Sequence, residues 1–374
     1  MYLFIIIPVL LAVGVDTVAA FWARGMGRHQ TPSTPVEDFT VLIPIYGNTR
    51  YLENVEYLSQ YGSRVTLVAT QGETPEFYES LNAIAREHGF NVYLSPSTVT
   101  ANAGRRATSG TIRDRIIRDA LRLVRTPWVV MLDADSTTVR PFGELFGEMA
   151  ADDHDVTSVK LVIRDEPGWL VRLQAHEYRL AMRLRFLAPW LVSGACHAGR
   201  TEAMRNVMNR HSLFFQGNDV ELGVLAKGLG YTVGHVPFEV LTSAPASVKP
   251  WLRQRLAWAG GEFRLFIPNI MWVFRHPFFW LYGAVLMFAT FPLRWLSVGH
   301  PGIPLGGAFA LYYVLILWLH WEHRDRWILL MPFYTLFSSL VLNPIGVVSY
   351  AWMAIKHRNV GIIRLRRKPV TQVA

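Results

Sequence analysis

The sequence predicts an α/β domain with a mostly parallel β-sheet, placed between two apolar ends. Between Val36 and about Pro250, short apolar runs alternate with polar, helix-like stretches, and strands that alternate with helices favour a parallel sheet covered on both faces. The chain is 51% hydrophobic and only 17% charged, whereas an average soluble protein has roughly 25% charged residues. Because the apolar excess lies mainly at the two ends of the chain, we expect membrane contact there.

The net charge and the cysteine content exclude several classes of protein. With 37 Lys and Arg against 28 Asp and Glu, the net charge is +9, which suits a nucleic-acid binder or a membrane protein. No RNP-like, zinc-finger or helix-turn-helix pattern is present, so we expect no nucleic-acid partner. The single cysteine, Cys196, excludes an intrachain disulfide and a multi-cysteine metal site.

Five apolar runs of the central region are predicted to be strands. They are Thr40–Tyr46, Arg64–Thr70, Phe90–Ser95, Trp128–Asp135 and Val156–Ile163. Open α/β sheets usually bind their ligands in the loops at the carboxyl ends of the strands. Candidate functional residues are therefore sought where these runs end.

Residues 1–23 are predicted to form an N-terminal transmembrane helix. Asp16 is the only charge in this stretch, which is long enough to cross a hydrocarbon core of about 30 Å. Arg24 and Arg28 follow it, and basic flanks favour the cytoplasmic side, so the central domain, residues 24–250, is expected in the cytoplasm. The alternative is a cleaved signal peptide, but no basic segment precedes the apolar run.

Residues 274–355 are predicted to contain the C-terminal transmembrane segments. Phe278–Leu293 and Leu305–His320 are interpreted as two spans. Trp327–Ile355 is too short for two full crossings and is interpreted as a hairpin of short helices bent at Pro344. A single tilted span is the alternative for this last stretch.

Residues 166–192 and 251–273 are predicted to be amphipathic helices in the membrane interface. In the first, Leu and Trp recur on one helical face beside a row of Arg, a pattern typical of interfacial helices. The alternative is an ordinary helix packed on the sheet. The basic tail, residues 356–374, is expected in the cytoplasm.

Two loops carry groups suited to a nucleotide. Pro44, Tyr46 and Asn48 end the first strand, where an aromatic ring and an amide suit a base or a ribose; a simple strand-to-loop junction is the alternative. Arg105 follows Gly104, and a guanidinium beside a glycine suits a phosphate. A basic surface turn is the alternative there.

Asp133 and Asp135 end a buried strand and are separated by one residue. Side chains two apart in a strand point the same way, so both carboxylates can face one divalent cation that also binds phosphates. Carboxylates at the end of an apolar strand are costly without such compensation. We expect a Mg²⁺ or Mn²⁺ site here.

Two later segments complete the candidate chemistry. Asp219 precedes a helix-like stretch and suits a general base that accepts a proton from an attacking hydroxyl, with helix capping as the alternative. Arg253–Trp258 supplies cations and an indole, although snorkelling arginines beside an interfacial tryptophan have the same composition.

Taken in order, these segments resemble the membrane-embedded processive glycosyltransferases of family 2, the hyaluronan, chitin and cellulose synthases, and hyaluronan synthase above all. The likeness runs from about Thr40 to Arg367. It implies a glycosyltransferase A-type fold, a UDP-sugar donor, a divalent metal ion and a growing glycan as acceptor. It also implies an integral protein of the plasma membrane whose catalytic domain faces the cytoplasm.

The resemblance assigns a role to each matching residue. Asp133 and Asp135 hold the metal ion, Asp133 also contacts the nucleotide, and Asp219 inherits the role of base. Arg105 stands where a diphosphate-binding lysine is usual. The remaining nucleotide contacts are Pro44, Tyr46, Asn48 and Glu73. The acceptor contacts are Ser193, Gly194, Arg200 and Trp258, and the contacts to the diphosphate and its gate are Gln254 and Arg255.

The chain departs from the family pattern at three places. The Asp that usually follows the second strand is absent, so either Gln71 or Glu73 substitutes for it or the base is held differently. Asn218 replaces an acidic residue before the expected base. Ala257 replaces the arginine of the Q-x-x-R-W motif, which normally helps to hold the diphosphate.

The expected reaction is a single displacement in which Asp219 deprotonates the acceptor hydroxyl and the α-linkage of the donor becomes a β-linkage. The β-linked polysaccharide would then leave across the membrane. One alternative is a non-processive enzyme that adds a single sugar to a lipid or polyprenyl phosphate. The other is a non-enzymatic, degenerate relative, which the departures at Gln71 and Ala257 motivate.

Overall fold

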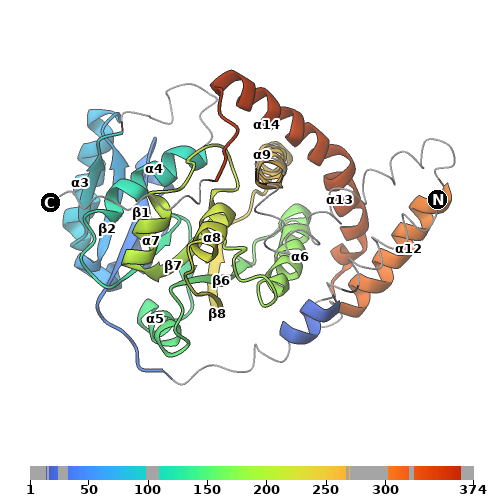
Figure 1. Ribbon diagram of the computed structural model, residues 1–374, viewed down its shortest axis with the longest axis horizontal. Helices are drawn as coiled ribbons and strands as arrows, with labels where there is room; N and C mark the ends of the chain where they lie inside the picture. The colour runs from blue at the N-terminus through green and yellow to red at the C-terminus, as the bar shows by residue number, and fades with distance from the viewer. Residues whose placement is uncertain are drawn as a thin grey trace.

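The computed structural model describes residues 14, 17–23, 33–97, 109–266, 269, 302–319 and 324–363. In these residues an eight-stranded mixed sheet forms the centre of the molecule, with strand order β3-β2-β1-β4-β7-β6-β8-β5. Helices lie on both sides of the sheet, and a curved row of C-terminal helices runs along one edge of the molecule (Figure 1).

The first half of the sheet is parallel. It consists of β1 (Phe39–Pro44), β2 (Val65–Thr70), β3 (Asn91–Ser95) and β4 (Trp128–Leu132). β1 pairs with both β2 and β4, and β2 pairs with β3. Every residue of β4 is buried, as expected for a central strand that is covered on both faces. Together with β6 (Val156–Ile163), these strands confirm all five predicted runs.

The second half contains three strands that the sequence did not predict. They are β5 (Thr137–Thr138), β7 (Cys196–Arg200) and β8 (Val233–Thr242). β7 runs antiparallel between β4 and β6, whereas β8 is parallel to β6 and pairs with β5 at the edge. β8 alternates buried and half-buried residues along its whole length, which is the period-two signal of a strand. β7 carries no such signal, because tertiary neighbours bury its small and polar residues.

Local sequence explains where the helices of the domain begin and end. In α3 (Pro75–His88), Thr74 Oγ1 accepts the N–H of Phe77 at 3.3 Å, and Gly89 ends the helix with a φ of 70°. The other helices here are α2 (Val55–Leu58), α4 (Ser109–Leu121), α5 (Phe142–Ala151), α7 (Thr201–Met208) and α8 (Asn218–Gly228), with short 3₁₀ helices at Thr49–Tyr51 and Ser59–Arg64.

The sheet separates two apolar clusters. Val41 and Ile43 of β1 belong to the cluster that contains residues of α3 and α5, whereas Leu42 belongs to the cluster with residues of α4, α7 and α8. Successive side chains of a strand point to opposite faces, so β1 contributes to both clusters. Apolar side chains therefore cover both faces, as the α/β prediction requires.

Two long helices, α6 (Trp169–Leu184) and α9 (Val248–Phe266), connect the domain to the C-terminal helices. Leu170 and Leu173 of α6 are buried in a cluster with Trp251 of α9 and Tyr334. These leucines belong to the segment 166–192 that was predicted to lie in the membrane interface. Protein covers these two leucines, and the residues that cover them belong to α9 and the C-terminal helices and not to the sheet.

The C-terminal helices that the structure describes are α12 (Gly302–Leu319), α13 (Met331–Phe337) and α14 (Asn343–His357), with 3₁₀ and π segments at Arg326–Leu330 and Ser338–Leu342. The predicted span Leu305–His320 corresponds to α12. The predicted span Phe278–Leu293 and most of the predicted span in residues 1–23 lie outside the described residues. Among the helices that are described, none has both the length and the apolar character needed to cross a membrane.

The predicted hairpin at Pro344 is wrong. Residues 326–357 form consecutive helical segments, and the residues that join them, Leu330, Ser338 and Leu342, have right-handed helical φ and ψ. A proline is tolerated in the first turn of a helix, where its missing N–H is not needed. The π segment therefore ends at the start of α14, and the chain continues in the same arc without reversing (Figure 1).

Glycines bring α9 unusually close to its neighbours on two sides. A Cβ on Gly260 would lie 2.8 Å from the carbonyl oxygen of Gly346 in α14. A Cβ on Gly261 would lie 2.6 Å from the carbonyl carbon of Gln216, in the loop before α8. Backbone therefore packs directly on backbone at both contacts, and no larger residue fits without moving a helix or the loop.

Candidate active site

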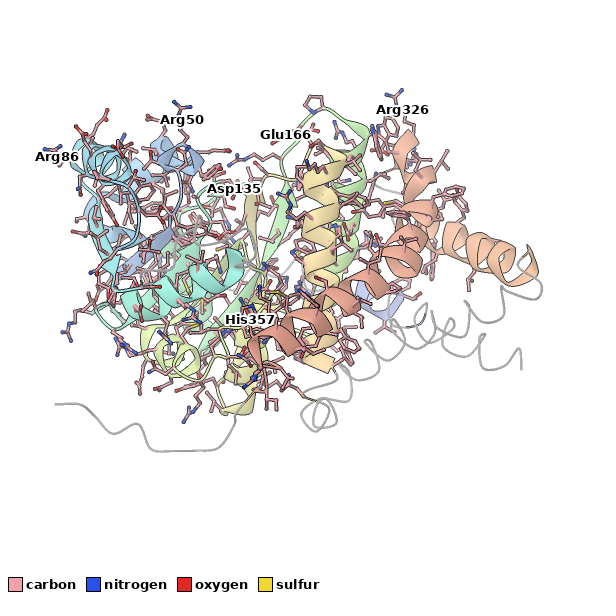
Figure 2. All side chains as sticks on the ribbon, turned by 90° about the horizontal axis from the view of Figure 1, so that it is seen from above. Arg50, Arg86, Asp135, Glu166, Arg326 and His357 are labelled. Atoms are coloured by element: carbon pink, nitrogen blue, oxygen red, sulfur yellow. The ribbon has the colours of Figure 1, made fainter. Side chains whose placement is uncertain are left out.

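The loop after β4 holds Asp133 and Asp135 at the edge of the sheet. The Asp133 N–H donates to the carbonyl of Ala195 at 2.9 Å, and Asn54 Nδ2 donates to the carbonyls of Asp133 and Ser136 at 3.1 and 2.6 Å. Asn54 is buried. These bonds fix the backbone that carries both carboxylates, and Figure 2 shows Asp135 between the part of the molecule marked by Arg50 and helix α9.

The two carboxylates form an oxygen-rich site. Burial and the nearby Asp133 carboxylate raise the pKa of Asp135 to about 6, as expected when two acidic groups share a site. In the part of the chain that the structure describes, no group of three or more His, Cys, Asp or Glu side chains is arranged to hold a metal ion. A cation held here would therefore complete its coordination with ligand oxygens or water.

Arg113 of α4 connects this loop to the loop before β7. Its Nε donates to Asp133 Oδ1 at 2.8 Å, and its second guanidinium nitrogen donates to the carbonyl oxygen of Gly194. Only 13% of the Arg113 side chain is exposed. Sequence reasoning did not single out Arg113. The sequence did contain one signal that Arg113 faces the protein interior. Arg113 lies next to Ile112 and one turn before Ile116, and both isoleucines are buried on the inner face of α4.

Asp219 lies in the first turn of α8. The cap residue of this helix is Gly217, with a φ of 85° and no side-chain cap, so Asp219 does not have the capping role that the sequence left open. A Cβ on Gly194 would lie 3.4 Å from Asp219 Oδ2, which places the carboxylate against the loop that Arg113 contacts. The structure therefore brings Asp133, Gly194 and Asp219 together.

Asn218, the unexpected amide before Asp219, is buried and contacts Asp114 of α4. Its Nδ2 donates to Asp114 Oδ2, and Asp114 Oδ1 lies 3.5 Å from Arg113 NH1. Burial raises the pKa of Asp114, while the charges of Arg113 and His211 act in the opposite direction. Like Arg113, Asp114 was not predicted to belong to this site.

The predicted diphosphate contact Arg255 points toward α6 instead. It is 5% exposed, its NH2 lies 2.6 Å from Glu177 Oε2, and its guanidinium lies 4.2 Å from the ring centroid of Trp258. The next residue of α6, Tyr178, has its ring 6.3 Å from Trp258. Gln254, the other predicted gate residue, is half-buried on the same helix.

The aromatic pair Tyr178–Trp258 adjoins the acidic groups. Burial raises the pKa of Tyr178, and the charges of Asp219 and Asp135 contribute to the same shift. Glu262, one turn beyond Trp258 on α9, was not predicted as a site residue. Its side chain is exposed to solvent.

Of the remaining predicted nucleotide contacts, the structure describes Pro44, Tyr46, Asn48 and Glu73. Asn48 Oδ1 accepts the N–H of Arg50 at 2.9 Å, which caps a 3₁₀ helix. Glu73 Oε1 accepts the hydroxyl of Thr70 at 3.0 Å, at the end of β2. Pro44 ends β1 and is buried. Tyr46 packs against the cluster beside α4, whereas Arg105 lies outside the described residues.

The two ends of the predicted acceptor segment are separated. Ser193 is buried and precedes Gly194, but Arg200 lies opposite Trp128, at the end of β4 farthest from Asp133. The guanidinium of Arg200 pairs with Asp153 and Asp155 instead. The structure therefore does not bring Arg200 to the site.

The chain belongs to glycosyl transferase family group 2, because the model of that family matches residues 128–355. This is the class that the order of motifs indicated, and the matched part includes both aspartates after β4, Asp219 and all of α9.

Two curated relatives are similar to the chain, and both are named N-acetylglucosaminyltransferase. The one from Azorhizobium caulinodans is 27% identical over 263 residues, which cover 64% of this chain and 63% of the relative. The one from Bradyrhizobium diazoefficiens is 32% identical over 110 residues, which cover 26% of this chain and 23% of the relative. The chain thus matches less than two thirds of the length of either relative.

The fold is similar to that of a solved glycosyltransferase. The mannosyltransferase PcManGT from Pyrobaculum calidifontis, solved with GDP-Man and Mn²⁺, superposes with a TM-score of 0.58 over 91% of this chain and 98% of its own. The sequences are 13% identical, so the likeness concerns the fold alone. It confirms the predicted glycosyltransferase A-type fold with a mostly parallel, mixed sheet.

Proposed function

We propose that the chain transfers a sugar from a nucleoside diphosphate sugar to a glycan hydroxyl, with inversion at the anomeric carbon. The convergence of Asp133, Gly194 and Asp219 carries this proposal. It brings a carboxylate pair suited to the donor and a separate carboxylate to the same loop at Gly194. A single displacement needs one group for the leaving diphosphate and a different group for the attacking hydroxyl, because these lie on opposite faces of the sugar.

Asp133 and Asp135 fit a divalent cation. Their oxygens suit Mg²⁺ or Mn²⁺, which are usually held by one or two carboxylates together with phosphate oxygens of the substrate. The raised pKa of Asp135 shows that this carboxylate lacks full compensation from the protein itself. When bound, the ion stabilises the negative charge that builds up on the departing diphosphate.

We expect chelation with EDTA to reduce transfer to the background rate and to weaken nucleotide binding. The reason is that Asp133 and Asp135 would repel the diphosphate without a cation between them. The measurements are UDP release and calorimetric titration with UDP, followed by addition of Mn²⁺ or Mg²⁺ to restore both. Undiminished transfer in EDTA would remove the metal ion from the proposal.

Asp219 is the base in the proposed reaction. It lies in the first turn of α8 with Oδ2 beside Gly194, and a carboxylate at that place can accept the proton of the attacking hydroxyl. The rings of Tyr178 and Trp258 offer an apolar surface on which the acceptor sugar can stack, as aromatic side chains do for flat apolar faces.

We propose UDP-N-acetylglucosamine as the first donor to test, because both curated relatives are N-acetylglucosaminyltransferases. The product is proposed to be a β-linked glycan that grows by repeated transfer. Incubation of the protein in nanodiscs with single and paired UDP-sugars, followed by size and linkage analysis, tests both points. If the product is a lipid or polyprenyl phosphate with one added sugar, the enzyme is non-processive and the proposed polymer is wrong. If no donor gives UDP release, the chain is a non-enzymatic relative.

We also propose that the chain is an integral protein of the plasma membrane with its catalytic domain in the cytoplasm. The apolar segments at 2–23 and 278–293 support this proposal. So does the outer face of α14, where large apolar side chains recur at helical spacing. They are Ile345, Val348, Trp352 and Ile355, with exposures of 49%, 68%, 60% and 76%. The opposite face of α14, with Gly346, Tyr350 and Ala354, is buried.

Nitroxide-labelled lipids test whether this face of α14 contacts the bilayer. Cys196 is buried and is the only cysteine, so a fluorophore can be placed selectively on Val348→Cys or Trp352→Cys. We expect strong quenching by the labelled lipids at both positions. A matched control is Val139→Cys, because Val139 is 63% exposed but lies on the catalytic domain. Equal quenching at positions 352 and 139 would contradict the proposed contact.

A further inference from the structure

Asp114 lies at the centre of the site but takes no part in the proposed chemistry. It is buried on α4. One of its oxygens accepts the amide N–H of Asn218, and the other lies 3.5 Å from Arg113 NH1. Arg113 in turn binds Asp133, and Asn218 immediately precedes Asp219. Asp114 thus contacts both Arg113, which binds Asp133, and Asn218, which precedes Asp219.

The residue types at this contact depend on each other. An ionised carboxylate only accepts hydrogen bonds, whereas an amide can donate through its nitrogen. Asn218 therefore satisfies Asp114, while a second carboxylate at position 218 would place two acceptors against each other in a buried place. This explains why the acidic residue expected before Asp219 is an amide in this chain: the nearby acid is supplied by α4.

The position of Asn218 matters because it is the first residue of α8. Gly217, with its left-handed φ of 85°, leads into it, and His211 Nε2 lies 2.8 Å from the Asn218 carbonyl oxygen. The bond from Asn218 to Asp114 is thus the link that ties this turn to α4. Because Asp219 follows directly, a displaced first turn would carry its carboxylate away from Gly194.

We propose that Asp114 is a positioning residue that holds the first turn of α8 so that Asp219 faces Gly194, and that holds Arg113 against Asp133. The inference rests on the proposed function, since it takes Asp219 to be the base. It makes the donor side and the acceptor side of the site one connected unit across α4. A misplaced catalytic group lowers turnover more than substrate binding, so the signature of this role lies in kcat.

The experiment exchanges the acid and the amide. Asp114→Asn and Asn218→Asp are made singly and together, and kcat and the donor KM are measured for each. We expect Asp114→Asn to lower kcat on the order of 10- to 100-fold, with the donor KM nearly unchanged. Asn218→Asp is expected to lower kcat at least as much. The double variant restores one donor and one acceptor, and so it should recover most of the lost kcat.

Asp119→Asn is the matched control. Asp119 is a buried carboxylate of the same helix that accepts the hydroxyl of Ser95 at 2.7 Å, and it contacts neither Asn218 nor Arg113 among the bonds described. It should keep the kcat of the parent chain. If Asp114→Asn does not fold, Asn218→Ala is measured in its place. Asn218→Ala removes the amide that donates to Asp114 but leaves the Asp114 carboxylate, and the same loss of kcat is expected.

Parent-like kcat in the single variants, or a double variant no better than the worse single one, overturns the inference. Asp219→Asn in the same assay separates this failure from that of the proposed function. If Asp219→Asn transfers sugar at the parent rate, the proposed function fails. If Asp219→Asn is inactive while Asp114→Asn is fully active, only the role of Asp114 fails.

Discussion

Asp219→Asn is expected to abolish sugar transfer while leaving UDP binding intact. The amide is nearly the same size as the carboxylate but cannot accept the proton of the attacking hydroxyl. A positioned general base typically contributes about 10²–10⁴-fold to a rate, so transfer should fall by about that factor. UDP binding should survive because the donor-side aspartates, Asp133 and Asp135, follow β4, while Asp219 lies beyond Gly194 on α8.

The measurements are single-turnover transfer and calorimetric titration with UDP. Asp153→Asn is a suitable control, because Asp153 is an exposed carboxylate that pairs with Arg200 far from the site, and it should behave as the parent chain does. Loss of UDP binding in Asp219→Asn would mean that Asp219 belongs to the donor site and is not the base.

The largest effect on stability is expected at the buried ion pair between Arg264 of α9 and Glu221 of α8. Both side chains are 0% exposed, and Arg264 NH1 lies 2.7 Å from Glu221 Oε2. Ser212 donates to Glu221 through both its N–H and its hydroxyl, at 2.6 and 2.7 Å. Removing one partner of such a pair leaves an uncompensated buried charge, at a cost of about 3–5 kcal/mol. We therefore expect Glu221→Gln and Arg264→Met each to lower the free energy of unfolding by about that amount.

The double variant Glu221→Leu/Arg264→Met removes both charges together. Replacing a whole buried pair by apolar residues is often neutral or stabilising, so this variant should be more stable than either single one. Chemical denaturation followed by circular dichroism provides the free energies. A double variant that is no more stable than either single variant would contradict this expectation.

The same pair predicts how stability changes in acid. Burial alone would raise the pKa of Glu221, but the charges of His211 and Arg264 and the bonds from Ser212 hold it below the ordinary value. A carboxylate with a lowered pKa in the folded chain stabilises the fold above its unfolded pKa, and this contribution is lost as the pH falls through the folded value. The parent chain should therefore exceed Glu221→Gln in free energy of unfolding by the full amount at neutral pH. This difference should shrink as the pH falls into the acid range.

Apolar runs predicted the parallel half of the sheet and the position of Asp133 and Asp135, because a strand that is buried on both faces has a strong local signal. β7 had no such signal, since neighbouring strands bury its small residues. Arg113 and Asp114 could not be predicted for a related reason. Nothing within α4 reveals that Asp133 lies against one of them and Asn218 against the other; only the packing of α4 on the sheet and on α8 brings them together.

Motif order pointed to Asp219, which the structure places beside Gly194, but it did not indicate the direction of two arginines. Arg255 was expected at the diphosphate and lies against Glu177, because position along a helix fixes the face on which a side chain lies. Arg200 was expected near the acceptor and lies at the far end of β4. Spacing in the sequence identified the elements of the site, whereas the geometry of each element decided which side chains reach it.

The glycine contacts of α9 have a mechanical consequence. Where two backbones touch, no side chain can rotate to absorb a displacement, and close-packed interiors transmit strain instead of dissipating it. The backbone of Gly260 contacts that of Gly346 in α14, and the backbone of Gly261 contacts that of Gln216, three residues before Asp219. A tilt of α14 would therefore displace α9 and then the loop at Gln216, which leads into the first turn of α8 with Asp219. A displacement of α14 would thus reach the alignment of Asp219 through α9.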